Sequence, residues 1–154
     1  MKLIKHLLDR KGRNIISIKP EDSVLDAIRL MAEKGIGSLV VMEDQEMLGI
    51  MSERDYARKV IIKGRSSEST AVSEIMTANV ITTSSSETVN ECMSVMTEKK
   101  IRHLPVVEDN AVIGMISIGD LVEAIIADQQ EEIEQLEHYI SGCMLRSEHL
   151  ITDS

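Results

Sequence analysis

Two short motifs carry side chains that could bind a ligand, and each consists of a serine followed three positions later by an aspartate. Ser52 precedes Asp55 and Ser117 precedes Asp120, and both motifs follow a glycine-containing apolar run. One interpretation is a helix cap, in which serine and aspartate bond to backbone N–H groups of the first turn. The other is a phosphate site at a helix N-terminus, with the aspartate accepting ribose hydroxyls. The motifs alone leave both interpretations open.

Other reactive constellations are absent from the sequence. Cys92 and Cys143 lie far apart and predict neither a disulfide nor a zinc site, so we expect small apolar side chains. The spacing of the four histidines is not that of a metal site: His6, His103, His138 and His149. No nucleophile can be assigned beside a base. Gly35-Ile36-Gly37 lacks the third glycine of a dinucleotide-binding loop. We therefore expect no catalytic activity.

The amino-acid composition limits the classes of molecule that the protein could bind. The 154 residues are 43% hydrophobic and 28% charged, which is typical of one globular unit. The net charge of −9 and the presence of only two aromatic residues, Tyr56 and Tyr139, argue against nucleic acid and anionic membranes. The apolar runs are too short to span a bilayer, and the N-terminus lacks the features of a secretion signal, so we expect a cytoplasmic protein. Seven acidic residues and one basic residue fall in the last 27 residues, so the positive and negative charges of the remaining chain are nearly balanced.

The chain contains an internal repeat. When the sequence is shifted by 65 positions, residues 15–62 align with residues 80–127 without a gap, and 14 of the 48 pairs are identical. Glycine, serine and aspartate of the two motifs are among the identical pairs, and most other apolar positions stay apolar. Each half is too small for a good core of its own, so the two copies must pack together.

Each copy predicts the same elements. In the first copy Ser23 caps an amphipathic helix that Gly35 ends, and Thr88 caps the equivalent helix of the second copy. Two apolar runs around an acidic turn then predict a hairpin, over 39–42 with 47–51 and over 104–107 with 111–116. Short strands at 15–17 and 80–82 would precede these elements, and a second helix would begin near each motif. Each copy is therefore β-α-β-β-α, with a linker rich in serine and glycine between them.

The duplicated pattern resembles a pair of cystathionine β-synthase (CBS) motifs, which form a Bateman module. The resemblance rests on Gly-h-h-Ser-x-x-Asp, where h is hydrophobic, at the end of both copies, and on the segment Ile101–Val107. The segments at 5–12, 63–67 and 136–142 are also similar to small stand-alone CBS-pair proteins of bacteria and plant organelles. The implied fold is α/β (α+β), with two repeats packed in pseudo-twofold symmetry. Its parts are an N-terminal helix (1–13), repeat one (14–63), a linker (64–78), repeat two (79–127) and an acidic helix and tail (128–154).

The resemblance also implies two clefts that bind an adenosyl ligand: AMP, ATP, NAD or S-adenosylmethionine. One cleft would use Asp120 for the ribose, Ser117 and Gly119 for phosphate, Arg102 with His103 as positive charges, and Ile16, Ile36 and Met115 as the adenine wall. The mirror cleft would use Asp55, Ser52 and Arg54, with Ile50, Ile81 and Ile101 as its wall. Because the first copy has Gly37 and Ser38 where the second has Arg102 and His103, we expect phosphate-rich ligands to favour the Asp120 cleft.

The C-terminal helix is expected to continue past repeat two with apolar residues at heptad spacing, namely Ile126, Ile133 and Ile140 at one position and Gln129, Leu136 and Cys143 at the other. It would either fold back on its own repeat or dock across a homodimer. The expected function is a non-catalytic regulatory module that senses an adenine nucleotide and signals to a partner protein. The alternative is a structural or protein-interaction dimer without a nucleotide.

Overall fold

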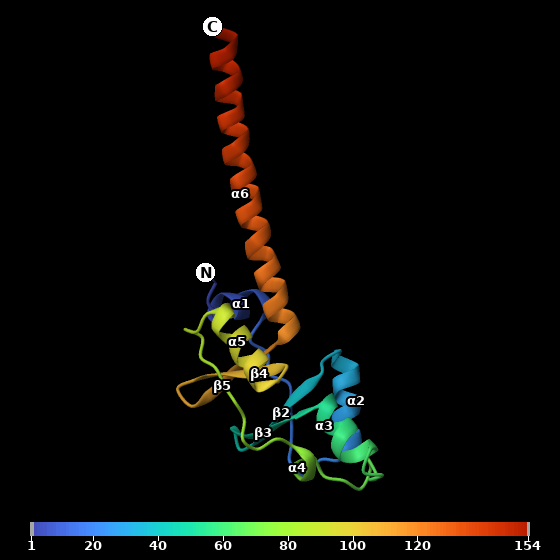
Figure 1. Ribbon diagram of the computed structural model, residues 1–154. Coiled ribbons are helices and arrows are strands. Elements are labelled where there is room, and N and C mark those ends of the chain that lie inside the picture. The colour runs from blue at the N-terminus through green and yellow to red at the C-terminus, as the bar shows by residue number, and fades with distance from the viewer. Residues whose placement is uncertain (1, 154) are drawn as a thin grey trace.

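The computed structural model describes the backbone of residues 2–153 and the side chains of residues 2–142. Two small α/β lobes lie against each other, and one long helix projects from the second lobe (Figure 1). The elements of lobe one are β1 (Ser17–Ile18), α2 (Val24–Lys34), β2 (Ser38–Glu43), β3 (Glu46–Ser52), α3 (Glu53–Tyr56) and a π-helix, η1 (Ala57–Ile61). Those of lobe two are α5 (Val89–Lys99), β4 (His103–Glu108), β5 (Ala111–Ser117) and α6 (Ile118–Asp153). Two further helices, α1 (Ile4–Lys11) and α4 (Val72–Ile75), precede the lobes in sequence. The predicted fold class of two repeats is confirmed.

The first helix of each lobe begins at the predicted cap. The backbone N–H of Asp26 donates to Ser23 Oγ over 3.1 Å, and the N–H of Glu91 donates to Thr88 Oγ1 over 3.0 Å. Gly35 ends α2 in the left-handed conformation, with φ of 65°. Lys100 takes the same conformation at the end of α5. The helix boundaries therefore follow from local hydrogen bonds that the sequence pattern predicts.

The two hairpins are duplicates in detail. β2 pairs antiparallel with β3 and β4 with β5, and each register shifts near its turn, after Val41 and Val106 respectively. The turn residues have positive φ, at Asp44 and Gln45 and again at Asp109 and Asn110. Two successive positive φ angles are typical of the type I′ turn, whose twist matches that of the flanking strands. β3 contacts β5, so the hairpins meet where the lobes join.

The short strands that should precede these elements differ between the lobes. β1 pairs parallel with β2, but its residues are Ser17–Ile18 rather than 15–17. The predicted strand over 80–82 is wrong, because in its place Thr83 makes a single parallel bridge to Val106. In lobe one the N–H of Val40 donates to the carbonyl of Ile16. Proline stands at the position equivalent to Val40, so the bond that would extend the second strand has no donor.

Each lobe is completed by the helix that precedes the other one. Ile4, Leu7 and Leu8 of α1 are buried in the core of lobe two, together with residues of α5, β4, β5 and α6. Val72 and Ile75 of α4 are buried in the core of lobe one. Residues 64–78 are therefore more than the linker that the sequence predicts, because α4 within them supplies buried side chains. We call this exchange the crossed packing of α1 and α4.

One repeated glycine in each lobe makes room for these helices. A Cβ atom at Gly114 would lie 2.7 Å from Leu8 Cδ2, and a Cβ atom at Gly49 would lie 2.6 Å from the carbonyl oxygen of Thr77. Contacts this short would force the neighbouring atoms to move. The identity of Gly49 and Gly114 in the repeat is thus explained by close approach.

Helix α6 extends far beyond lobe two. Its first turns pack through Leu121 and Ala124, which are buried in the core of that lobe. Beyond an ion pair between Lys2 and Asp128, the helix runs away from both lobes (Figure 1), and its side chains over 129–141 are exposed. The alternative in which this helix folds back on its own lobe is therefore wrong for these residues. The predicted heptad position at Cys143 lies outside the described side chains.

Candidate functional site

Both serine–aspartate motifs form helix caps. At the start of α3 the N–H of Asp55 donates to Ser52 Oγ over 3.1 Å, and the N–H of Ser52 donates to Asp55 Oδ2 over 2.9 Å. At the start of α6 the equivalent distances, between Ser117 and Asp120, are 3.2 and 2.8 Å. The cap interpretation is confirmed for both motifs. A ligand-binding role must therefore coexist with capping.

Asp55 has further partners in the cleft between the lobes. Its Oδ1 accepts from Lys59 Nζ at 3.0 Å and from Thr77 Oγ1 at 3.4 Å, and its Oδ2 also accepts from the Ser52 hydroxyl. The residue is only 9% exposed. A carboxylate has about four acceptor sites, so these donors nearly saturate it. Any ligand hydroxyl that binds Asp55 must displace one of them.

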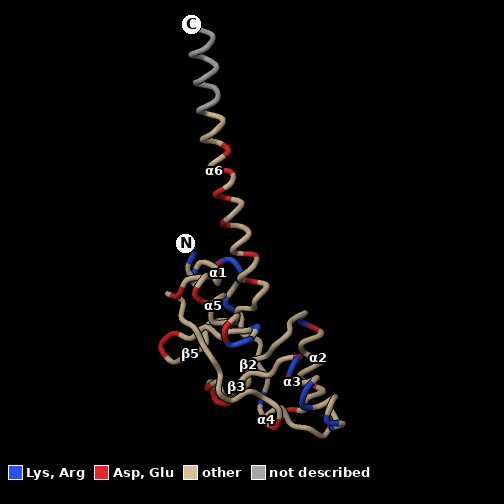
Figure 2. The backbone as a smooth tube through the Cα atoms, in the orientation of Figure 1, with Lys and Arg blue, Asp and Glu red and all other residues tan. Residues whose placement is uncertain are grey.

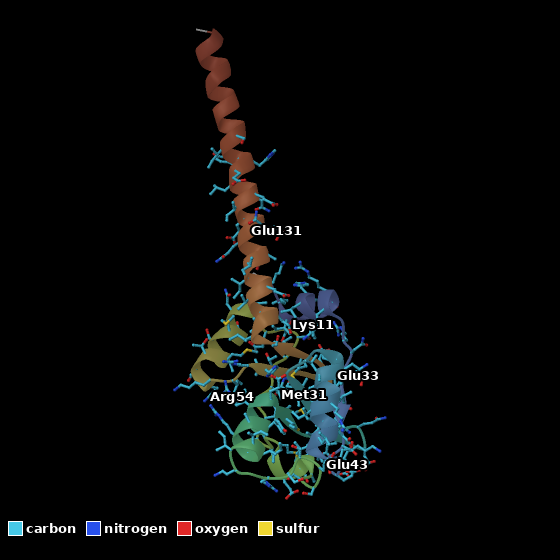
Figure 3. All side chains as sticks on the ribbon, turned by 90° about the vertical axis from the view of Figure 1, so that its right-hand side faces the viewer. Lys11, Met31, Glu33, Glu43, Arg54 and Glu131 are labelled. Atoms are coloured by element: carbon cyan, nitrogen blue, oxygen red, sulfur yellow. The ribbon has the colours of Figure 1, made fainter. Side chains whose placement is uncertain are left out.

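A cleft of about 570 Å³ opens beside Asp55. It is lined by both lobes: the predicted Ser52, Arg54, Asp55, Ile50, Ile81 and Ile101, together with Gly37, Glu53, Arg58, Lys59, Thr77, Asn79, Val80, Arg102 and His103. The structure therefore brings together every residue predicted for the mirror cleft. Arg54 crosses from α3 to the other lobe (Figure 3), where Nη1 donates to the carbonyl of Lys100 over 2.9 Å. A cavity of this size and shape is typical of a small-molecule site.

Arg102 and His103 line this cleft, and His103 also lies close enough to Lys11 and Asp120 for their charges to act on its imidazole. The backbone carbonyl of Arg102 accepts from the N–H of Ile118, in its own lobe, but the Arg102 side chain lines the cavity of Asp55. The assignment of both residues to Asp120 stays a prediction, and the Arg102 side chain is placed in the lining of the Asp55 cleft.

The cleft is rich in positive charge. Its lining includes four cationic side chains, those of Arg54, Arg58, Lys59 and Arg102. It includes only two carboxylates, those of Glu53 and Asp55. Sequence reasoning missed Arg58 and Lys59, which follow Asp55 by one turn. The repeat itself held the signal, because Glu123 and Ala124 stand at the equivalent positions of the second copy. The difference between the copies predicts which cleft attracts an anion.

The surroundings of His103 disfavour its protonated form. Burial lowers the pKa of His103 below its ordinary value, and the positive charges of Lys11, Arg102 and Arg54 lower it further, although Asp120 opposes them. A proton on this imidazole would face three cations. The sequence prediction of a second positive charge below about pH 6.5 is therefore corrected to a lower pH.

This perturbed histidine makes stability depend on pH. We expect the free energy of unfolding to fall as the pH is lowered through about 6.5, because the unfolded His103 then binds a proton that the folded protein excludes. The contribution is present above this pH and is lost as the pH falls toward the folded-state pKa. Urea unfolding measured between about pH 8 and pH 5 should show a shallower decline in His103→Gln. The exposed His138→Gln is the control, and identical curves for the parent and His103→Gln would contradict the prediction.

The region of Asp120 is built differently. Lys11 of α1 pairs with Asp120 Oδ2 and donates to the carbonyl of Met115 over 2.7 Å. The cavity here, of about 260 Å³, is lined by Lys2, His6, Leu7, Arg10, Lys11, Asp120, Glu123 and Ala124. Within the described side chains, the other residues predicted for this cleft do not line this cavity: Ser117, Gly119, Met115, Ile16 and Ile36. Ile16 and Ile36 instead pack against the core of lobe one.

Other sites are not formed within the described residues. None of the helices there combines the length and apolar character needed to cross a bilayer. No group of three histidine, cysteine, aspartate or glutamate side chains in that part of the chain is placed to hold a metal ion. Cys92 is buried, and its burial raises the pKa of the thiol. The prediction of a small apolar side chain at this position is confirmed.

Comparison with known proteins identifies two copies of one domain in the chain. The family profile described as "CBS domain" matches twice, over residues 7–62 and 72–127. The chain is 45% identical over 127 residues to the CBS domain-containing protein CBSX3, mitochondrial, of Arabidopsis thaliana, and the match covers 79% of this chain and 62% of the plant protein. The chain therefore spans less than two thirds of that relative.

Two solved structures share the fold. The CBS-domain structure NE2398 has a TM-score of 0.79 at 45% identity, covering 81% of this chain and 98% of that one. The CBS domain pair of protein MJ0100, in complex with 5′-methylthioadenosine and S-adenosyl-L-methionine, has a TM-score of 0.74 at 25% identity, covering 83% and 98%. That pair thus holds adenosyl compounds.

Proposed function

The chain belongs to the CBS-domain family and is a regulatory CBS pair, and on this premise we propose that it binds a phosphorylated adenosine ligand in the Asp55 cleft. The observation that carries the proposal is the composition of that cleft. One cavity combines a carboxylate, an apolar wall of Ile50, Ile81 and Ile101, and four cationic side chains. These are the groups that ribose, adenine and phosphate respectively require.

The proposed contacts begin with the nucleoside. Adenine would lie between aliphatic side chains and be recognised by backbone groups, because no phenylalanine, tyrosine or tryptophan is among the described residues that line the cleft. The ribose hydroxyls would donate to Asp55 Oδ1 in place of Thr77, whose bond is the longest at 3.4 Å, and of Lys59. Ser52 would keep Asp55 oriented through the cap. Released from Asp55, Lys59 becomes available to a phosphate.

The phosphates would bind Arg58, Lys59 and Arg102. Guanidinium groups bind phosphate in a bidentate manner, and the adjacent cations are unfavourable to one another until an anion neutralises them. This favours AMP, ATP or NAD over S-adenosylmethionine, which has no phosphate. The adenosyl compounds bound by the MJ0100 pair support the nucleoside part of the proposal.

Regulation would follow from the position of the cleft. Because residues of both lobes line it, a ligand joins the lobes and can alter how they meet. We assign the chain a non-catalytic role, in which a cytoplasmic partner protein detects this change. A homodimer formed through the lobes is part of the proposal, since Ile61 and Ile62 at the end of η1 are 58% and 75% exposed. Light scattering of the purified chain measures that state.

Calorimetric titration with AMP, ATP, NAD and S-adenosylmethionine tests the site. We expect one phosphorylated ligand per chain and a loss of about 1.5–3 kcal/mol of binding free energy in Asp55→Ala, the range for hydrogen bonds to a charged group. Asp120→Ala is the matched control, because it removes the same kind of cap. A second ligand at Asp120 would have to displace Lys11. Binding that Asp120→Ala abolishes and Asp55→Ala leaves intact would place the ligand in the other cleft.

The competing function is a structural interaction protein without a nucleotide. The observation in its favour is that both aspartates already have partners and act as caps. On that account, no adenosyl ligand gives heat with protein shown to be free of bound nucleotide, and Asp55→Ala and Asp120→Ala change only stability. Each would then lose about 1 kcal/mol or less, because an acid in the first turn of a helix contributes only modestly to stability.

A further inference from the structure

Helix α6 presents an apolar stripe that nothing in the described structure covers. The stripe consists of Val122, Ile126, Ile133, Leu136 and Ile140, which are between 42% and 59% exposed. Their spacing alternates between four and three residues once Gln129 is included, which places them along one side of the helix. Ile126, Ile133 and Ile140 occupy one heptad position, and Val122, Gln129 and Leu136 occupy the other. A mainly aliphatic pair of heptad positions is typical of a seam between two helices.

The side chains beside the stripe are acidic. Glu132 flanks it on one side, Glu137 and Glu123, which are two heptads apart, flank it on the other, and Glu134 lies further round the helix. Acidic positions recur along α6 (Figure 2), and residues 118–142 contain no lysine or arginine. A helix that packs on the stripe therefore meets negative charge on both sides.

This charge decides against a second copy of the same helix. In a parallel pair, Glu132 of one chain would face Glu137 of the other, and an antiparallel pair would also bring glutamate to glutamate. Like charges at these flanking positions oppose association. We infer that α6 docks an amphipathic helix of a different protein, in which lysine or arginine residues flank an apolar seam.

The ligand cleft has a physical connection to this surface. The first N–H of α6, at Ile118, donates to the carbonyl of Arg102 over 2.8 Å, and the Arg102 side chain lines the cleft. A movement of Arg102 toward a phosphate would therefore act on the start of α6. Only the identification of the docked protein as the regulated partner rests on the proposed function.

Two synthetic helices, each about four heptads long, test the inference. Both carry isoleucine and leucine along the seam, one with lysine and the other with glutamate at the flanking positions. By fluorescence anisotropy with the full chain and no nucleotide, we expect the lysine peptide to bind at least about 30-fold more tightly. Added salt should narrow this difference, because it screens exposed charges.

Variants of the full chain locate the contact. Ile133→Asp should weaken the lysine peptide by about tenfold or more, and Glu132→Gln should weaken it measurably. Glu131→Gln is the matched control and should have little effect, because the heptad spacing places Glu131 on the side of the helix opposite the seam. Circular dichroism confirms that each variant is folded.

Two results would overturn the inference. One is equal affinity of the lysine and glutamate peptides, or binding of neither. The other is a dimer in light scattering that Ile133→Asp converts to a monomer, since the stripe would then be covered by a second copy. Because no nucleotide is present, failure here leaves the Asp55 proposal untouched, and failure of nucleotide binding leaves this one untouched.

Discussion

Replacing Arg58 and Arg102 together with alanine should weaken ATP binding by about 3 kcal/mol or more, a rise in Kd of about 150-fold, and should leave adenosine nearly unaffected. Both side chains line the Asp55 cleft. Each lost hydrogen bond to a charged phosphate is worth about 1.5–3 kcal/mol, whereas adenosine offers no phosphate to lose. Calorimetric titration of adenosine, AMP and ATP measures the difference.

The control for this pair removes the same charge elsewhere. Arg13 bonds to Asp9, and Arg29 lies on α2, so neither belongs to the cleft. Arg13→Ala combined with Arg29→Ala should reduce ATP affinity only through the weaker overall field, an effect that about 0.15 M salt largely screens. Equal losses of adenosine and ATP in the Arg58 and Arg102 variant would mean that the two arginines shape the cavity without contacting phosphate.

Leu8→Ala should destabilise the protein by about 2–5 kcal/mol, the range for truncating a fully buried leucine. Leu8 of α1 is 0% exposed and belongs to the core of lobe two. Gly114→Ala should itself cost about 1–3 kcal/mol, because the new methyl group would overlap Leu8. In the double variant that methyl enters space which Leu8 has vacated. The two costs should therefore fall short of additivity by at least about 0.5 kcal/mol in urea unfolding.

Lobe one supplies the comparison. The atom that would meet a Cβ at Gly49 most closely is the backbone oxygen of Thr77, and Met76 is the next neighbour. Removing a side chain cannot relieve a backbone contact, so Met76→Ala should rescue Gly49→Ala less well than Leu8→Ala rescues Gly114→Ala. Full additivity of Leu8→Ala and Gly114→Ala would show that α1 does not pack against β5.

Local features were predictable because they depend on residues within one turn of each other. The caps at Ser23, Ser52 and Ser117 and the hairpin turns involve hydrogen bonds that span at most four positions. The repeat then extended each local interpretation to a second copy. An apolar period identifies a buried face, so the helices and hairpins followed.

The sequence did not predict in the same way which lobe a side chain or a short helix contacts. Arg102 stands next to β4 in sequence, yet its side chain faces the helix of the other copy, since a strand end has two sides. The crossed packing could not be predicted, because a short apolar segment such as Val72–Ile75 does not indicate in which core it is buried. The prediction of a strand over 80–82 was wrong because Pro105 has no backbone N–H to donate, and the apolar pattern does not show this.

The crossed packing also orders the events of biosynthesis. A ribosome releases the chain from its N-terminus at about 5–20 residues per second. Lobe one can close as soon as α4 emerges, whereas α1 must wait for β5 and Leu121. Helix α1 precedes both lobes in sequence and is nevertheless buried after lobe one, roughly 5–20 s after its own synthesis at that rate. During that interval Ile4, Leu7 and Leu8 are available to chaperones or to neighbouring nascent chains, and lobe two can form only after Leu121 and Ala124 have left the ribosome.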